Sequence, residues 1–366
     1  MIKKLRLVLL ILCTTLTISG TSFASSNMPH IDVSKTPLNY SHVRPQSDGT
    51  FHDGLLFAEQ SNGALVYYKT NGKLAFTLPA DIKPLSDFFE QRALVINKKT
   101  QLIGYINTTG KLAIPCIYTE AGYFSEGLAY VSMPHSKGEA FIDRTGKIVN
   151  TFKQKYSSEY YFSDGLAVVY APLGNKVGFI NTAGELAISY KYNFSRGFSE
   201  GLALVQNSNG LYGYINTTGK QVIPFQYKSG GDFSEGWAPA QNSKGKWGFV
   251  DRFGKVVIPF KYDNASGFSE GLAIVYNAQG KIGFINKKGT LVIGYQKYNR
   301  AFPFKEGFAL VGITTKSDPS GKYGYIDRQG KLQTKLAYQS ASSSFHDGYA
   351  IALQELGTGF ILTKRP

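Results

Sequence analysis

The sequence has few of the residues on which several protein classes depend. It contains two cysteines, three methionines and two tryptophans in 366 residues, and only 18% of its residues are charged. So few cysteines exclude a disulfide-stapled fold. After the N-terminal apolar run, no segment reaches the ~20 apolar residues that a membrane-spanning helix needs. P-loop, His-Glu-x-x-His and Cys-x-x-Cys motifs and a Ser-His-Asp pattern are also absent, so no enzyme class is indicated.

Glycine and aromatic residues are abundant instead. The chain has 40 glycines, 24 tyrosines and 25 phenylalanines, and the usual share of glycine is only about 7%. Residues that favour strands and tight turns therefore dominate, and no stretch shows a convincing 3.6-residue period. This composition predicts an all-β protein and excludes a coiled coil, a helical bundle and low-complexity disorder.

Residues 1–24 are typical of a secretory signal peptide. Three cations among the first six residues precede the apolar run 7–12, and small residues at −3 and −1 predict cleavage after Ala24. We therefore expect a secreted or cell-surface protein with no membrane span in the mature chain. Removal of the three cations would lower the formal net charge from +15 to +12.

One unit of about 35 residues repeats about nine times over residues 51–362. Its first phrase is Phe-Ser-Glu-Gly-Leu-Ala, as at Phe198. The second is Tyr-Gly-Tyr-Ile-Asn-Thr-Thr-Gly-Lys at 212–220, and the third is Val-Ile-Pro-Phe-Gln-Tyr at 222–227. Each phrase predicts a strand, and the glycine that closes the Asn-x-x-Gly turn requires a positive φ. The unit is therefore predicted to be a three-stranded antiparallel meander.

These three phrases, recurring in fixed order, resemble the WG repeat family of bacterial proteins, also called KWG repeats. The resemblance covers residues 36–362, although the Trp-Gly pair that names the family occurs once, at Trp247-Gly248. It implies tandem β-repeats in a secreted or surface protein, with binding or scaffolding rather than chemistry. No catalytic residue can be transferred from the family, and we expect no cofactor.

The repeats must stack, because one meander cannot bury a hydrophobic face alone. Two arrangements are open: a β-propeller-like ring and an open β-solenoid. The last repeat lacks its third strand, and residues 36–41, within the N-terminal segment 25–50, resemble an orphan third strand. Pairing that strand with the last repeat would close a ring and remove the open edges. Residues 363–366 are expected to form a short tail.

Every unit carries an acidic residue in its first phrase. An enzyme would pair two such carboxylates as acid and base. A position that recurs nine times is better explained by structure, with each carboxylate accepting backbone N–H bonds at a turn. The residues are Asp53, Glu90, Glu126, Asp164, Glu200, Glu235, Glu270, Glu306 and Asp347.

Six units carry a lysine directly after the turn glycine. Stacked units would align these lysines in a basic stripe that attracts polyanions such as wall teichoic acid or phospholipid head groups. Nucleic acid is not an expected partner of an exported protein. Solvated lysines that protect strand edges are the alternative. The residues are Lys73, Lys111, Lys147, Lys220, Lys255 and Lys331.

Three further sets of residues are candidate contacts. Trp237 and Trp247 fall in one unit and could touch a ligand. Tyrosines that end the third phrase, such as Tyr227, form a ladder that either packs between units or offers a face to sugars. His52 and His346 hold the same position in the first and last units. In a closed ring they would be adjacent and could bind Zn²⁺, and otherwise the match is incidental.

The sequence thus predicts an exported, non-enzymatic repeat protein that binds a cell-envelope component or a protein partner. The alternative is a propeller-type enzyme acting on wall glycans. That enzyme would need a polar cluster that the repeat does not generate.

Overall fold

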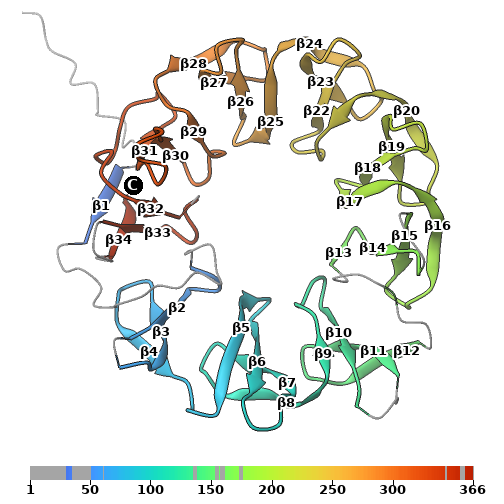
Figure 1. Ribbon diagram of the computed structural model, residues 1–366, viewed down its shortest axis with the longest axis vertical. Coiled ribbons are helices and arrows are strands. Elements are labelled where there is room, and N and C mark those ends of the chain that lie inside the picture. The colour runs from blue at the N-terminus through green and yellow to red at the C-terminus, as the bar shows by residue number, and fades with distance from the viewer. Residues whose placement is uncertain are drawn as a thin grey trace, which may run out of the picture.

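The computed structural model describes residues 30–34, 51–60, 62–134, 138–152, 156, 161–172, 176–342, 344–354 and 359–365. Within these ranges the regular structure is entirely β, so no helix there could cross a membrane. The expected signal peptide 1–24 and the expected closing strand 36–41 lie outside the described residues. The strands form nine small antiparallel sheets around a central opening (Figure 1). The chain is therefore a nine-bladed β-propeller, and the predicted ring is confirmed.

The strands follow one another blade by blade. Blades 1–3 contain β2 (Leu55–Glu59), β3 (Leu65–Lys69) and β4 (Leu74–Thr77); β5 (Ile82–Phe89), β6 (Arg92–Asn97), β7 (Ile103–Asn107) and β8 (Leu112–Tyr118); and β9 (Glu120–Ala121), β10 (Leu128–Ser132), β11 (Glu139–Asp143) and β12 (Ile148–Phe152). Blades 4–6 contain β13 (Phe162–Ser163), β14 (Leu166–Tyr170), β15 (Val177–Asn181) and β16 (Leu186–Tyr192); β17 (Phe194–Ser199), β18 (Leu202–Gln206), β19 (Tyr212–Asn216) and β20 (Gln221–Tyr227); and β21 (Ser229–Gly230), β22 (Trp237–Gln241), β23 (Trp247–Asp251) and β24 (Val256–Tyr262). Blades 7–9 contain β25 (Asn264–Ser269), β26 (Leu272–Tyr276), β27 (Ile282–Asn286) and β28 (Leu291–Gln296); β29 (Arg300–Ala301), β30 (Phe308–Ile313) and β31 (Lys322–Asp327); and β32 (Ser340–Ala341), β33 (Tyr349–Leu353), β34 (Gly359–Arg365) and β1 (His30–Val33).

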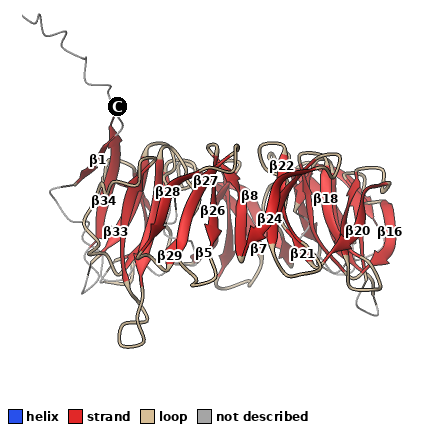
Figure 2. Ribbon diagram, turned by 90° about the horizontal axis from the view of Figure 1, so that it is seen from above, coloured by secondary structure: helices blue, strands red, loops and turns tan. Residues whose placement is uncertain are grey.

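The three predicted strands recur from blade to blade, and most blades add a fourth strand that the sequence analysis does not identify. In blade 5, β17 precedes the predicted strands and lies at the edge of the central opening, whereas β20 lies outermost (Figure 1). In side view the blades stand next to each other and form a ring about one strand tall (Figure 2). The inner strands therefore line the wall of the opening.

Two kinds of tight turn at the same end of blades 1 to 8 explain the repeated sequence. Glu200 and Gly201 have φ values of 53° and 77°, so the hairpin from β17 to β18 is a type I′ turn, in which both central residues need positive φ. At the next turn on this end, the Gly219 N–H donates to the Asn216 carbonyl at 2.8 Å, and Gly219 has φ 78°. The predicted glycine conformation is confirmed.

The hydrophobic core lies between the blades rather than within one. Nine clusters of buried residues each join two adjacent sheets. The tyrosine ladder is part of this core, since its described members are 4–6% exposed: Tyr118, Tyr192, Tyr227, Tyr262, Tyr298 and Tyr338. Packing between units, not a sugar-binding face, therefore explains the ladder. Tyr40 lies outside the described residues.

The N-terminal strand β1 closes the ring. It pairs antiparallel with β34, so that Ile31 lies opposite Lys364 and Asp32 opposite Thr363. The Arg365 guanidinium donates to the Asp32 carboxylate at 2.9 Å, and Ile31 is 8% exposed in the core between blades 8 and 9. Strand exchange therefore supplies the outer strand of the last blade, through residues 30–33. Residues 363–365, expected in a tail, continue β34.

Candidate functional site

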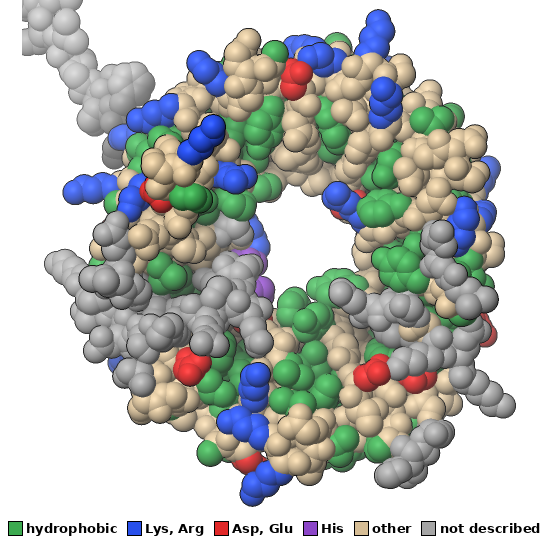
Figure 3. All heavy atoms as spheres, viewed as in Figure 1, with side chains coloured by type: hydrophobic (Ala, Val, Ile, Leu, Met, Phe, Trp, Pro, Cys, Tyr) green, Lys and Arg blue, Asp and Glu red, His purple; other side chains and the backbone are tan. Residues whose placement is uncertain are grey.

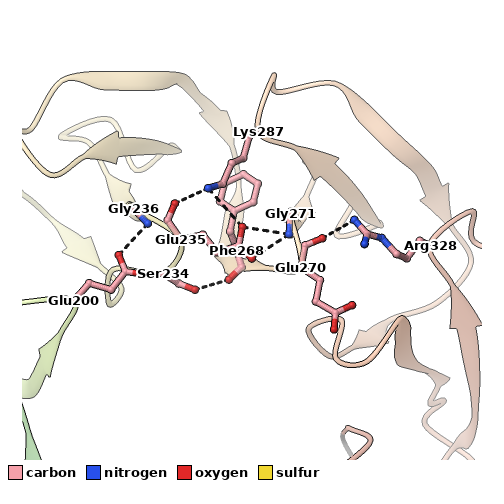
Figure 4. Close-up of polar contacts among 9 residues, drawn as sticks. All are labelled: Glu200, Ser234, Glu235, Gly236, Phe268, Glu270, Gly271, Lys287 and Arg328. Atoms are coloured by element: carbon pink, nitrogen blue, oxygen red, sulfur yellow. Dashed lines mark hydrogen bonds and ion pairs between the residues drawn. The ribbon is translucent and has the colours of Figure 1, made fainter. Parts of the chain in front are cut away.

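The repeated carboxylates hold neighbouring blades together. The Glu200 carboxylate accepts a hydrogen bond from the Gly236 N–H of the next blade at 2.9 Å, and Glu235 does the same with Gly271 at 3.0 Å (Figure 4). Eight junctions share this bond: Asp53–Gln91, Glu90–Gly127, Glu126–Gly165, Asp164–Gly201, Glu200–Gly236, Glu235–Gly271, Glu270–Gly307 and Glu306–Gly348. The predicted structural role is confirmed, and the N–H donor belongs to the next blade rather than to the same turn.

The phenylalanine and serine of the same phrase complete this contact. Phe233 is 1% exposed, and its ring meets the Tyr214 ring of the preceding blade edge-on with 5.0 Å between centroids. The Ser199 hydroxyl donates to the Phe233 carbonyl at 2.7 Å. The phenylalanine and acidic residue of the phrases, with the serine where it is present, form an inter-blade belt. One phrase thus satisfies apolar and polar groups at each junction, which explains its recurrence.

Two basic side chains reinforce the belt. The Lys287 ammonium donates to the Glu235 carbonyl and lies 3.5 Å from its carboxylate, and the Arg328 guanidinium donates to the Glu270 carbonyl at 2.7 Å (Figure 4). Both cations follow the Asn or Asp that begins a turn. They are therefore structural, and they differ in position from the lysines that follow the turn glycines.

The six predicted lysines, here named the rim lysines, occupy equivalent places in six blades. Each is exposed and follows a turn glycine at the end of the blade that also carries the belt hairpins: Lys73, Lys111, Lys147, Lys220, Lys255 and Lys331. Among the described residues, no carboxylate forms an ion pair with any of these six ammonium groups. Because the fold is a ring, the lysines form an interrupted circle rather than a straight stripe. Glu185 and Thr290 hold the position in blades 4 and 7, and blade 9 has no equivalent turn because β1 supplies its outer strand.

The two tryptophans have different surroundings. The Trp237 ring lies edge-on to Phe268, with 5.5 Å between centroids, and the Lys287 ammonium lies 5.3 Å from the Trp237 centroid. Both contacts come from the next blade, so Trp237 packs between blades. Trp247 is half-buried and lines a pocket in the wall of the central opening.

His52 and His346 lie next to each other at the junction of the first and last blades. Their ring centroids are 5.5 Å apart, and Figure 3 shows histidine side chains on the wall of the opening. The Lys305 ammonium lies 3.0 Å from the ring nitrogens of His346, and Asp87 lies 4.0 Å from His52. The adjacency that a shared metal ion needs is present.

The chemistry of this cluster fits a metal ion less well than its geometry does. An ammonium group next to His346 repels a cation and occupies the nitrogen lone pair that a metal would need. Within the residues that the structure describes, no group of three or more His, Cys, Asp or Glu side chains is arranged to hold a metal. The zinc hypothesis therefore rests on two imidazoles alone.

Sequence reasoning missed that the histidines belong to a longer interruption of the belt. The position after the belt phenylalanine is serine in five consecutive blades, 3 to 7, but Lys305, His346, His52 and Phe89 in the other four. These four side chains contact one another in order, since the His52 and Phe89 ring centroids are 5.6 Å apart. Alignment of the nine phrases would have revealed this set. We name it the seam cluster.

The junction between blades 9 and 1 also lacks two of the repeated contacts. Asp347 makes no hydrogen bond with the Gly54 N–H, although both residues are described. Ile361 takes the place of the tyrosine or phenylalanine that elsewhere meets the belt phenylalanine, and it packs with Phe51. The pairing of β1 with β34 therefore makes an important contribution to closing the ring.

Comparisons with known proteins agree with the repeat structure. The pattern of the WG-containing repeat family matches residues 103–133, 178–212, 212–247, 247–279, 282–313 and 323–355, more than half of the chain. Comparison with curated proteins finds no match. Among solved structures, the computationally designed Ika8 protein is similar at 11% identity and a TM-score of 0.47, over 91% of this chain and 98% of that one. BamB from Moraxella catarrhalis is similar at 13% identity and a TM-score of 0.42, over 90% and 100%. Both likenesses are too distant to carry an argument about function, whereas the six repeat matches show that this chain belongs to the family of WG-containing repeat proteins.

Proposed function

We propose that this chain is an exported, non-enzymatic propeller that attaches to an anionic component of the cell envelope. The observation that carries the proposal is the circle of rim lysines, which are exposed and without ion pairs among the described residues. Charges arranged on one end of a rigid ring act together on an extended polyanion. The formal net charge, +15 for the full sequence and +12 after the expected cleavage, favours the same class of partner.

The use of the acidic residues supports binding rather than catalysis. Eight of the nine repeated carboxylates are engaged in belt hydrogen bonds. A carboxylate that holds two blades together through a backbone N–H has a structural role that binding to a substrate would disrupt. The alternative, an enzyme acting on wall glycans, has one observation in its favour, because the seam cluster is a polar group that the repeat does not generate.

Replacing Lys220, Lys255 and Lys331 by glutamine is expected to weaken retention on beads that carry poly(glycerol phosphate) roughly tenfold or more. A lysine near an anionic surface contributes about 1 kcal/mol at ordinary salt. The wild-type protein should also be released when salt rises from about 0.1 M to 1 M, because the screening length falls from about 10 Å to about 3 Å. Retention is measured by the protein that elutes at each salt concentration.

The matched control removes three exposed lysines from the opposite end of blades 6 to 8. Lys244, Lys281 and Lys316 lie in the loops that join the first and second predicted strands, away from the rim lysines. Their triple glutamine variant has the same net charge as the first and should keep its retention. An equal loss of retention in both triple variants, or retention that does not change with salt concentration, would contradict the proposal. Release of soluble sugar from wall material by the wild-type protein would favour the enzyme instead.

A further inference from the structure

A pocket in the wall of the central opening lies between blades 5, 6 and 7. It is lined by residues of the inner strands β17, β21 and β25 and by the start of β23, and its cavity volume is about 540 Å³. That volume falls within the range of about 300–1,000 Å³ that is usual for small-molecule sites. Every residue that lines it belongs to the described part of the chain.

Two opposite charges line this pocket without forming an ion pair. Arg196 comes from β17, and Asp232 follows β21 in the next blade. No nitrogen of Arg196 lies within 4.0 Å of the Asp232 carboxylate, although Figure 3 shows basic and acidic side chains together on this side of the opening. Burial raises the pKa of Asp232, and the positive charge of Arg196 opposes that rise. The charges of Arg196 and Asp232 influence each other, but neither side chain is held by a hydrogen bond to the other.

The Asp232 carboxylate has an unmet hydrogen-bonding need. Its Oδ1 atom is buried and has no hydrogen-bond partner in the described residues. A buried polar atom without a partner costs about 1–3 kcal/mol, so such atoms are rare in folded proteins unless a ligand or water satisfies them. The unpaired oxygen therefore points to a bound group that donates a hydrogen bond.

The remaining lining supplies an aromatic surface and a fixed floor. Trp247 belongs to the single Trp-Gly pair of the chain, whereas Tyr212 and Ile282 hold its position in the neighbouring blades. A Cβ added to Gly230 would lie 2.9 Å from the Leu204 side chain, and one added to Gly231 would lie 2.8 Å from Pro239. Neighbouring side chains already fill the space beside these two glycines, so the backbone here forms a close-packed floor of the pocket.

We propose that this pocket binds a neutral hexopyranose unit of an envelope glycan. A sugar ring offers neighbouring hydroxyls, of which one can donate to the Asp232 carboxylate and another can accept from the Arg196 guanidinium. Its apolar C–H face suits the electron-rich face of the Trp247 indole. Asp232 disfavours a simple anion and Arg196 a simple cation, so a neutral polyol fits best. The inference deepens the proposed binding function, but it uses a different surface from the rim lysines.

The test is isothermal titration calorimetry of the full mature chain with glucose, galactose, N-acetylglucosamine and the β-1,4-linked disaccharide of N-acetylglucosamine. At least one of these sugars should bind saturably. Asp232→Asn, Arg196→Gln and Trp247→Phe should each weaken that binding by about tenfold or more, because hydrogen bonds to charged groups and aromatic contacts carry such factors. Trp237→Phe is the matched control and should leave the affinity unchanged.

Three outcomes would overturn the inference. They are no heat with any of the four sugars, unchanged affinity in Asp232→Asn, and tighter binding of glycine or inorganic phosphate than of every sugar. Asp232→Asn differs by one atom and should keep the wild-type unfolding temperature. If that variant nevertheless fails to fold, the sugar affinity of Arg196→Gln provides the same test. Retention on poly(glycerol phosphate) beads should be unchanged in Asp232→Asn, so failure of the pocket and failure of the rim lysines remain distinguishable.

Discussion

Replacing Phe233 by alanine is expected to lower the free energy of unfolding by about 3–5 kcal/mol, the usual cost of removing a large buried ring. Phe233 is 1% exposed, and its ring meets Tyr214 across the junction between two blades. The substitution would leave a cavity at the belt, where the backbone carbonyl of residue 233 also accepts the Ser199 hydroxyl. Chemical denaturation monitored by circular dichroism measures the loss.

The chain offers a matched control for this substitution. Phe253 lies in a turn of the same blade and is 86% exposed. Phe253→Ala removes the same atoms from solvent rather than from a junction, so stability should change by no more than about 0.5 kcal/mol. Similar losses in the two variants would mean that the inter-blade belt is not where the repeat phrase stabilises the fold.

Removal of β1 should have the second large effect. A chain that starts at residue 35 loses the pairing with β34, the burial of Ile31 and the hydrogen bond between Arg365 and Asp32. Burial of an isoleucine alone contributes about 1.5–3 kcal/mol, and each hydrogen bond adds about 0.5–1.5 kcal/mol. We expect a loss of at least about 3 kcal/mol. The junction between blades 9 and 1 lacks the carboxylate bond, and Phe51 meets Tyr349, with 6.1 Å between ring centroids, instead of an aromatic residue at the position of Ile361.

The control for this truncation is a chain that starts at residue 30 and keeps β1. It should unfold at the temperature of the longer protein, measured by differential scanning calorimetry. The shorter chain should also elute earlier in size-exclusion chromatography, because an opened ring is less compact. A truncated chain with unchanged stability and elution would show that the ring closes without β1.

Much of the fold was predictable because the repeated phrases contain residues with strong local preferences for turns and strands. Gly219 needs a positive φ whatever the neighbouring blades do, and the third phrase reads as a strand by composition alone. The inner strand β17 was not predictable in this way. Its residues include Phe194 and Arg196, which share no pattern with the same positions in other blades. A strand that is hydrogen-bonded along just one of its edges needs little sequence regularity.

The candidate sites were less predictable, because they depend on which blades meet. The neighbouring positions of His52 and His346 follow from a closed ring, and the structure places their rings side by side. The contact of Lys305 with His346 needed the actual geometry. The pocket with Arg196 and Asp232 combines residues from separate repeats, so no single motif contains it. The pocket and the seam cluster depart from the repeat, whereas the inter-blade belt and the rim lysines recur with it.

The most direct test of the closed ring is a disulfide between β1 and β34. Asp32 and Thr363 lie directly opposite each other in the antiparallel pair, within reach of the Cβ separation that a disulfide allows. In a Cys116→Ser background, Asp32→Cys with Thr363→Cys should oxidise within one molecule. The bridge should raise stability by more than about 4 kcal/mol, because it closes a very long loop. Peptide mass spectrometry and a non-reducing gel identify the bridge, and Asp32→Cys with Lys220→Cys should form none. An oxidised product that links only separate molecules, or no bridge at all, would contradict the closed nine-bladed ring.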